Sequence, residues 1–299
     1  MSPATSTALK LNNDVTIPAI GLGVFQSPPE ETTSAVEAAL RDGYRLIDTA
    51  AAYGNEREVA EGIRRSGVAR DEVFVATKLW ISDYGFEAAK VGFAASLRRL
   101  EVDYVDLYLL HQPVPSDFEK TIGAYQAMES FLAEGRARAI GVSNFSAEHL
   151  RTLIDRTDAV PAVNQVEIHP YFSQPALRAV HADLGILTQA WSPIGGILVY
   201  VPGSDEGRGP LTDPVVTALA TKYDKTPAQV VLRWHVEHGT SAIPKSVKAY
   251  RIAENFGVFD FSLTADEVAT IDALDKGVRG GPDPEKLNRD THPKVVDNS

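Results

Sequence analysis

The chain has 299 residues, of which 44% are hydrophobic, and a formal net charge of −11. This acidity argues against a nucleic-acid partner, because binding to phosphates requires a basic surface. The absence of cysteine excludes disulfides and thiolate metal sites, and no apolar run is long enough to span a bilayer. The start, MSPATSTALK, lacks the basic and apolar regions of a signal peptide, so we expect a cytoplasmic protein.

The chain opens with an expected hairpin over residues 9–18 that turns at Asn12 and Asn13. After it, short runs rich in Ile, Val and Leu alternate with amphipathic helical stretches. Apolar side chains on both faces of such runs are typical of a parallel sheet that helices cover on both sides. Eight runs predict strands, at residues 18–23, 44–49, 73–80, 105–111, 138–144, 162–168, 186–192 and 241–246.

Capping residues indicate where several helices begin and end. Ser116 and Thr226 each open a capping-box pattern, and a third pattern opens an additional helix near residues 267–275. The tail from Gly277 is polar and rich in turn residues, and we expect it to cross the surface. Four glycines follow helical runs, where a left-handed residue commonly ends a helix: Gly43, Gly135, Gly185 and Gly239.

Eight strands alternating with helices predict a (β/α)8 barrel, and an open doubly wound sheet is the main alternative. No linker rich in Pro or Ser divides the chain, so we expect one domain over residues 1–299, with residues 276–299 as a C-terminal loop. A barrel brings the carboxyl ends of its strands to one face, where active sites form. Polar residues lie at the ends of seven consecutive predicted strands: Asp48, Lys78, His111, Ser143–Asn144, Gln165, Trp191–Ser192 and Lys245–Ser246.

From about Lys10 to Asp275 the chain resembles the aldo-keto reductases. The motifs of that family occur here in its order: GLGVF, DTAAAYGNE, TKLW, LLHQP, GVSNF, NQVEIHP, SPIGG, and IPKS followed by RIAENF. The stretch GGPDPEKLN in the tail is similar to the bacterial branch that includes the 2,5-diketo-D-gluconate reductases. The resemblance implies a (β/α)8 barrel that reduces aldehydes and ketones to alcohols with NADPH.

The resemblance also implies a catalytic set of four residues. Tyr53 matches the general acid, and a free tyrosine has a pKa of about 10, which makes it a reluctant donor. Lys78 matches the residue whose ammonium lowers that pKa, and Asp48 would keep Lys78 charged and oriented. His111 would direct the substrate carbonyl. From the residues alone, Asp48 could also be a helix cap and His111 a core histidine.

The cofactor site must form without the usual dinucleotide fingerprint, because the chain has only GxG at Gly21 and no phosphate-binding loop. The resemblance implies that Ser143, Asn144 and Gln165 hydrogen-bond the nicotinamide carboxamide and that Trp191 stacks on its ring. Backbone N–H groups would bind the pyrophosphate within SPIGG, at Ser192, Ile194, Gly195 and Gly196.

A basic stretch, KSVKAYR, is unusual in this acidic chain. Its residues Lys245, Ser246 and Arg251 match the family's clamp for the 2′-phosphate of NADPH, and a guanidinium can hold a phosphate with two hydrogen bonds. Glu254 and Asn255 match residues around the adenine. The resemblance therefore implies a preference for NADPH over NADH.

Phe25 and Trp80 match apolar residues of the family's substrate pocket, although either could be a core aromatic. Gln112 departs from the family, in which tryptophan commonly follows the catalytic histidine, and its amide favours a more polar substrate. Small aldehydes, dicarbonyls and keto sugars all stay open. The loop at residues 197–213 could cover the cofactor. We expect no metal site, because no metal-ligand pattern is present, and a monomer.

Two other functions stay open. A Schiff-base lyase would use Lys78 as its covalent amine, but it leaves Tyr53, Asn144 and the basic stretch without a purpose. A non-enzymatic NADPH sensor would keep the cofactor residues without turnover, and the presence of all four catalytic candidates argues against it.

Overall fold

The computed structural model describes residues 8–195 and 209–299. At its centre, eight parallel strands pair in chain order. Each overlaps one of the predicted runs, so the eight strand predictions are confirmed. The strands are β3 (Leu22–Gly23), β4 (Leu46–Asp48), β5 (Phe74–Leu79), β6 (Val105–Leu110), β7 (Ala137–Ser143), β8 (Val163–Glu167), β9 (Leu187–Trp191) and β10 (Ser241–Ala242).

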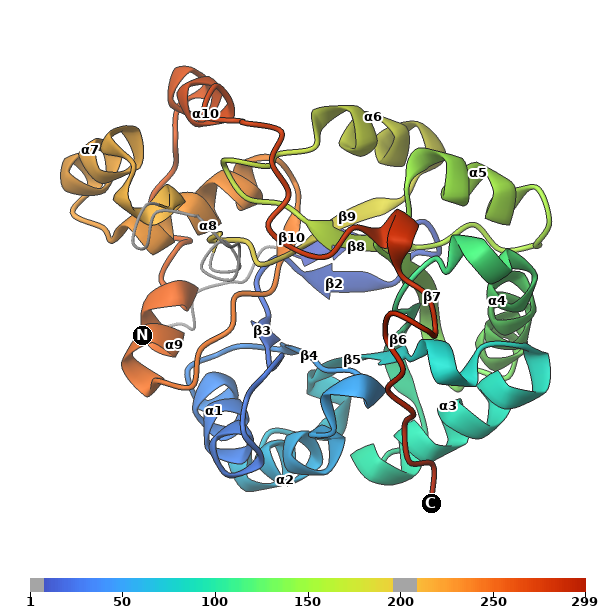
Figure 1. Ribbon diagram of the computed structural model, residues 1–299. Coiled ribbons are helices and arrows are strands. Elements are labelled where there is room, and N and C mark those ends of the chain that lie inside the picture. The colour runs from blue at the N-terminus through green and yellow to red at the C-terminus, as the bar shows by residue number, and fades with distance from the viewer. Residues whose placement is uncertain (1–7, 196–208) are drawn as a thin grey trace.

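Contacts between the first and last strands close the sheet into a barrel. The N–H of Gly23 donates to the carbonyl of Pro244 over 3.1 Å, and the N–H of Ala242 donates to Ala19 over 2.8 Å. A parallel bridge also joins Ile20 to Ala242. Figure 1 shows the strands as a ring with the helices outside it. The predicted (β/α)8 barrel is confirmed, and the open-sheet alternative is wrong.

Helices connect successive strands and cover the outside of the ring (Figure 1). The barrel helices are α1 (Pro29–Arg41), α2 (Glu56–Ser66), α3 (Phe86–Leu100), α4 (Phe118–Ala133), α5 (Ala147–Ile154), α6 (Pro175–Leu184), α8 (Pro227–Glu237) and α9 (Ala249–Phe256). Two more are additions, α7 (Pro214–Tyr223) and α10 (Ala265–Asp272). The second is the predicted additional helix, whereas the strand–helix alternation does not predict α7. Within the described ranges no helix has the length and hydropathy needed to cross a membrane.

The predicted N-terminal hairpin consists of β1 (Ala8–Lys10) and β2 (Thr16–Pro18), paired antiparallel. Its turn is bound to the barrel, because Asn13 donates to the carbonyl of Arg138 over 2.8 Å and Asn12 to that of Pro161 over 3.2 Å. These carbonyls lie where β7 and β8 begin. The hairpin therefore covers the end of the barrel opposite the predicted active site.

Two of the three predicted capping boxes are confirmed. The side chains of Thr226 and Thr264 accept hydrogen bonds from the third residues of α8 and α10. The prediction at Ser116 is wrong, because Pro115–Asp117 form a 3-10 turn and α4 begins after it without a side-chain cap. The predicted helix-ending glycines all have φ between 64° and 105°: Gly43, Gly135, Gly185 and Gly239.

The alternation of side chains along the strands places the polar residues inside the barrel. In β5, Phe74 and Ala76 belong to an apolar cluster with the hairpin residue Ile17, and Lys78 follows on the same face. The same spacing puts His111 beyond Leu109. The barrel interior is thus apolar near the hairpin and polar at the carboxyl ends of the strands.

Candidate active site

A cavity of about 800 Å³ opens at the carboxyl ends of the strands. Lys78 lies beneath it and is buried. Most predicted site residues line this cavity: Phe25, Asp48, Tyr53, Trp80, His111, Gln112, Ser143, Asn144, Gln165, Trp191, Ser192, Ile194 and Lys245. The fold therefore brings together side chains that lie far apart in the sequence.

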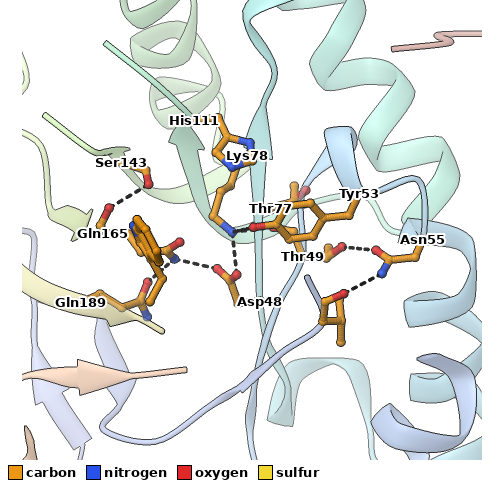
Figure 2. Close-up of polar contacts among 12 residues, drawn as sticks. Asp48, Thr49, Tyr53, Asn55, Thr77, Lys78, His111, Ser143, Gln165 and Gln189 are labelled. Atoms are coloured by element: carbon orange, nitrogen blue, oxygen red, sulfur yellow. Dashed lines mark hydrogen bonds and ion pairs between the residues drawn. The ribbon is translucent and has the colours of Figure 1, made fainter. Parts of the chain in front are cut away.

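Lys78 is the centre of the polar contacts in Figure 2. Its Nζ donates to Asp48 Oδ1 over 2.5 Å and to the carbonyl of Thr49 over 2.9 Å, and it lies 3.5 Å from the Tyr53 hydroxyl. Burial is the largest single effect on the pKa of Lys78 and lowers it, but Asp48 and Tyr53 together outweigh burial and raise that pKa above 10.5. Lys78 is therefore an ammonium at neutral pH.

The pKa of Tyr53 reflects two opposed effects. Burial raises this pKa above its usual value of 10.0, and the Lys78 ammonium lowers it by a smaller amount. The expectation of a net lowered pKa is therefore wrong, because the loss of solvation outweighs the attraction of one ammonium at 3.5 Å. Tyr53 keeps its proton throughout the neutral range.

The turn that holds Tyr53 is fixed at both ends. Ala51–Tyr53 form a 3-10 turn that ends in Gly54 at φ 71°. The Thr49 hydroxyl donates to Asn55 Oδ1 over 2.8 Å, and Asn55 Nδ2 donates to the carbonyl of Val24 over 2.9 Å (Figure 2). These bonds set the position of the Tyr53 hydroxyl relative to Lys78.

His111 follows β6 and lies between two aromatic rings. Its ring meets those of Tyr53 and Trp80 edge-on, at centroid distances of 5.6 and 5.0 Å. Burial, with a smaller effect of the Lys78 ammonium, lowers the pKa of His111 well below 6.5. Its imidazole is therefore neutral at pH 7 and can donate one hydrogen bond to a carbonyl oxygen.

Side chains at the carboxyl ends of β7 and β9 hold one another in place. Trp191 Nε1 donates to Asn144 Oδ1 over 2.9 Å. Asn144 Nδ2 donates to the carbonyl of His111 and to Ser143 Oγ, both at 3.1 Å, so its amide protons are already in use. Ser143 in turn donates to the Gln165 carbonyl over 2.7 Å. The indole of Trp191 is thereby fixed against the cavity wall.

The basic stretch lies where α9 begins. Ser246 Oγ accepts the N–H of Lys248 over 3.1 Å, and the guanidinium of Arg251 lies 5.6 Å from the ring centre of Tyr250. Lys248, the residue before α9, makes no side-chain cap hydrogen bond to the first turn of that helix. Cations beside a helix N-terminus favour an anion there.

Several predicted cofactor residues lie outside the cavity lining. Glu254 accepts a hydrogen bond from the Thr226 hydroxyl over 2.8 Å and so joins α9 to α8, and Asn255 is buried. Gly195 has φ 76°, and a Cβ there would meet Pro210 at 2.7 Å. Gly196 and most of the 197–213 loop fall outside the described residues.

The C-terminal tail forms a wall of the cavity, which the sequence patterns did not locate. Figure 1 shows the tail crossing in front of the ring of strands. Trp80 Nε1 donates to the carbonyl of Lys294 over 2.9 Å, and Lys294 Nζ donates to the carbonyl of Ala52. The tail residues that line the cavity are Pro282, Leu287, Thr291, His292, Pro293 and Lys294.

Glu167, the last residue of β8, anchors this tail. Its buried carboxylate accepts the N–H groups of Gly280 and Gly281 over 2.8 and 2.9 Å, and His169 Nε2 lies 3.1 Å away. Burial raises the pKa of Glu167, but these hydrogen bonds outweigh burial and lower it below 4.5. A Cβ on Gly281 would lie 2.4 Å from the Trp191 ring. The sequence features that correspond to this contact are the glutamate in NQVEIHP and the paired glycines Gly280 and Gly281 in the tail.

Within residues 8–195 and 209–299, no group of three or more His, Cys, Asp or Glu side chains could hold a metal ion.

The chain is similar to known proteins over nearly its whole length. A model of the aldo/keto reductase family matches residues 19–276. Morphine 6-dehydrogenase of Pseudomonas putida is 53% identical over 293 residues, which cover 97% of this chain and 99% of that protein. Methylglyoxal reductase DkgA of Escherichia coli K12 is 44% identical over 284 residues, 95% of this chain and 99% of that protein. The crystal structure of a Bombyx mori aldo-keto reductase in complex with NADP superimposes with a TM-score of 0.84 at 36% identity, covering 93% of this chain and 95% of that one.

Proposed function

The chain belongs to the aldo/keto reductase family of NADP(H)-dependent oxidoreductases, and we propose that it reduces aldehydes and ketones to alcohols with NADPH, using Tyr53 as the general acid. The observation behind this proposal is the Tyr53 hydroxyl, which lies at the cavity 3.5 Å from the Lys78 ammonium. A protonated phenol with a cation beside it is suited to giving a proton to a carbonyl oxygen.

The reduction needs a hydride on the carbonyl carbon and a proton on the carbonyl oxygen. The nicotinamide of NADPH supplies the hydride when it is bound. Tyr53 Oη gives its proton to the carbonyl oxygen, and the negative charge that develops on Oη is stabilised by Lys78. Asp48 keeps Lys78 charged and directed at Tyr53. General acid catalysis of this kind contributes about 10²–10⁴-fold to rate.

His111 has a separate part in this proposal. Its neutral imidazole donates a hydrogen bond to the same carbonyl oxygen and so turns the carbonyl toward Tyr53. A neutral ring does this without placing a second cation beside Lys78. Phe25 and Trp80 supply apolar walls, and Gln112 supplies an amide.

The described residues fit NADPH in their donor set. Gln165 offers a carbonyl oxygen to the nicotinamide carboxamide, and the indole of Trp191 offers a flat surface to its ring. Lys245, Ser246 and Arg251 would hold the 2′-phosphate where α9 begins. Ser192, Ile194 and the SPIGG glycines would present N–H groups to the pyrophosphate, and Glu254 and Asn255 would lie near the adenine.

We propose small aldehydes, dicarbonyls or keto sugars as substrates. The relative from Escherichia coli is named for methylglyoxal, a small dicarbonyl, whereas the relative from Pseudomonas putida is named for morphine. Gln112, His292 and Lys294 place polar groups in the cavity lining, which suits a small oxygenated substrate. One chain provides this lining, so we also propose that the protein acts as a monomer.

The Schiff-base lyase is disfavoured by the state of Lys78. A lysine must be deprotonated to attack a carbonyl carbon, but Lys78 is buried as an ammonium and donates to Asp48 and Thr49. An NADPH sensor would need neither Tyr53 at the cavity nor a neutral His111 beside it.

The test is steady-state oxidation of NADPH with methylglyoxal, simple aldehydes and keto sugars, alongside NADPH binding measured by protein fluorescence. We expect turnover with at least one class. Binding of NADPH with no turnover of any carbonyl would support the sensor instead. If NADPH does not bind, the assignment of the cofactor residues is wrong.

A further inference from the structure

A row of hydrogen bonds runs from the active site into the barrel, and Figure 2 shows its upper part at Gln165 and Gln189. Gln165 Nε2 donates to Asp48 Oδ2 over 2.8 Å and to Gln189 Oε1 over 2.7 Å. Gln189 Nε2 donates to Ser241 Oγ over 3.1 Å, and the Ser241 hydroxyl donates to the carbonyl of Pro18 over 3.1 Å. Gln165, Gln189 and Ser241 are all buried, so water does not replace these partners.

The direction of every bond in this row is set from its lower end. The backbone carbonyl of Pro18 can only accept, so Ser241 must donate its one proton to it. The oxygen of Ser241 is then left to accept, and Gln189 turns its NH₂ group toward it. Gln189 consequently turns its carbonyl oxygen toward Gln165.

Gln165 thus faces two acceptors, and its amide has one favourable direction. The Asp48 carboxylate and Gln189 Oε1 take both protons of its NH₂ group. A half-turn of the amide would bring Gln165 Oε1 against both acceptors and leave them unpaired. No donor in the described part of the chain reaches Oε1, and Gln165 lines the cavity. Gln165 therefore presents an acceptor to the cavity.

We propose that Gln189 is a positioning residue. It orients the Gln165 amide so that Gln165 Oε1 accepts a hydrogen bond from the NH₂ of the nicotinamide carboxamide. This rests on the proposed function, in which Gln165 contacts that carboxamide. Asp48 alone would orient the Gln165 amide less firmly. Its Oδ1 accepts from Lys78, so the position of the Asp48 carboxylate depends on that ion pair. Gln189 adds a neutral acceptor that is tied to the barrel backbone through Ser241.

The proposal predicts selectivity between two nucleotides that differ at one group. The 3-acetylpyridine analogue of NADP⁺ has a methyl ketone in place of the carboxamide, so it has no proton to give to Gln165. The wild-type protein should bind NADP⁺ about tenfold more tightly than this analogue, a ratio that corresponds to one buried hydrogen bond.

Two substitutions at one position separate orientation from packing. Gln189→Met keeps the length of the side chain and removes the strong acceptor, so the tenfold ratio should fall toward one. Gln189→Glu should keep the ratio, because burial keeps the carboxyl protonated, with its C=O toward Gln165 and its O–H toward Ser241. Titration of protein fluorescence with each nucleotide gives the dissociation constants, and thermal denaturation checks folding.

Each outcome decides the proposal. It is overturned if the wild type does not distinguish the nucleotides, if folded Gln189→Met keeps the wild-type ratio, or if Gln189→Glu loses it to the same extent. If Gln189→Met does not fold, Ser241→Ala replaces it, since it removes the group that directs Gln189, and an unchanged ratio there overturns the proposal. Failure of the proposed function is distinct, because the wild type would then bind neither nucleotide or turn over no carbonyl.

Discussion

Lys78 Nζ lies 2.5 Å from Asp48 Oδ1 inside the barrel, and both side chains are buried. Neither charged group can be solvated by water if its partner is removed. A buried ion pair is therefore costly to break at one side only, whatever the pair contributes while it is intact.

Asp48→Asn should lower the free energy of unfolding by about 3–5 kcal/mol, since it leaves the Lys78 ammonium without a carboxylate. The double variant Asp48→Asn/Lys78→Met should be more stable than Asp48→Asn, because the unpaired charge is gone. Urea denaturation of both variants measures the difference. The exposed pair Lys10–Asp14, 2.6 Å apart, provides the control. Asp14→Asn should change stability little, and an equal loss for the two asparagine variants would contradict this reasoning.

Arg251→Ala should weaken NADPH binding at least about tenfold and leave NADH binding unchanged, because only NADPH has the 2′-phosphate. Lys248→Ala is the matched control, since it removes the same charge from the same basic stretch without touching the proposed clamp. Fluorescence titration with each nucleotide measures both effects. An unchanged NADPH dissociation constant in Arg251→Ala would show that the clamp lies elsewhere.

Glu167→Gln should loosen the C-terminal tail, because one of the two glycine N–H groups would then face an amide NH₂. The KM for the carbonyl substrate should rise several-fold, and hydrogen exchange should become faster over residues 280–296. Glu285→Gln is the control, since Glu285 is a tail residue whose partner His149 lies outside the cavity lining. Equal exchange rates in the two variants would argue against the anchor.

The stability of the protein should fall between pH 6.5 and pH 5. Burial lowers the pKa of His181 to about 4 and that of His235 to about 3. The unfolded chain binds protons at these histidines below about pH 6.5, whereas the folded chain does not until the lower pKa values are reached. Each histidine therefore lowers the free energy of unfolding by up to about 1.4 kcal/mol for each pH unit that the pH falls.

Urea denaturation at pH 8, 6.5 and 5 measures this loss, and few carboxylates titrate in that range. In His181→Asn the free energy of unfolding should depend less steeply on pH, because the variant binds about one proton fewer on unfolding. This holds whatever the stability of the variant at pH 8. A free energy of unfolding that stays constant from pH 7 to pH 5 would contradict the burial of neutral imidazoles.

The barrel and the core of the site could be predicted from the sequence because both follow from short local patterns. Alternation along each strand puts Lys78 and Gln165 on the inner face, and a parallel barrel brings all strand ends together. Gln189 follows the same alternation as Trp191, two positions earlier. It was not singled out, because an amide within a strand has no distinctive motif around it.

The remaining misses come from contacts between distant segments. Nothing near Trp80 or Lys294 in the sequence indicates that they meet, and the tail lacks the periodicity that would place it. The cap at Ser146 was not predicted, because His149 takes the place of the usual Glu or Gln in the box. The direction of the Tyr53 pKa depends on burial, which a motif does not specify.

The most direct measurement compares Tyr53→Phe with the wild type in steady-state NADPH oxidation, with the NADPH dissociation constant measured in parallel. Phenylalanine keeps the ring that packs 5.0 Å from Phe25 and removes only the hydroxyl. If Tyr53 is the general acid, kcat should fall by about 10²–10⁴-fold while NADPH binds as before. A kcat close to the wild-type value, with NADPH still bound, would show that another group gives the proton.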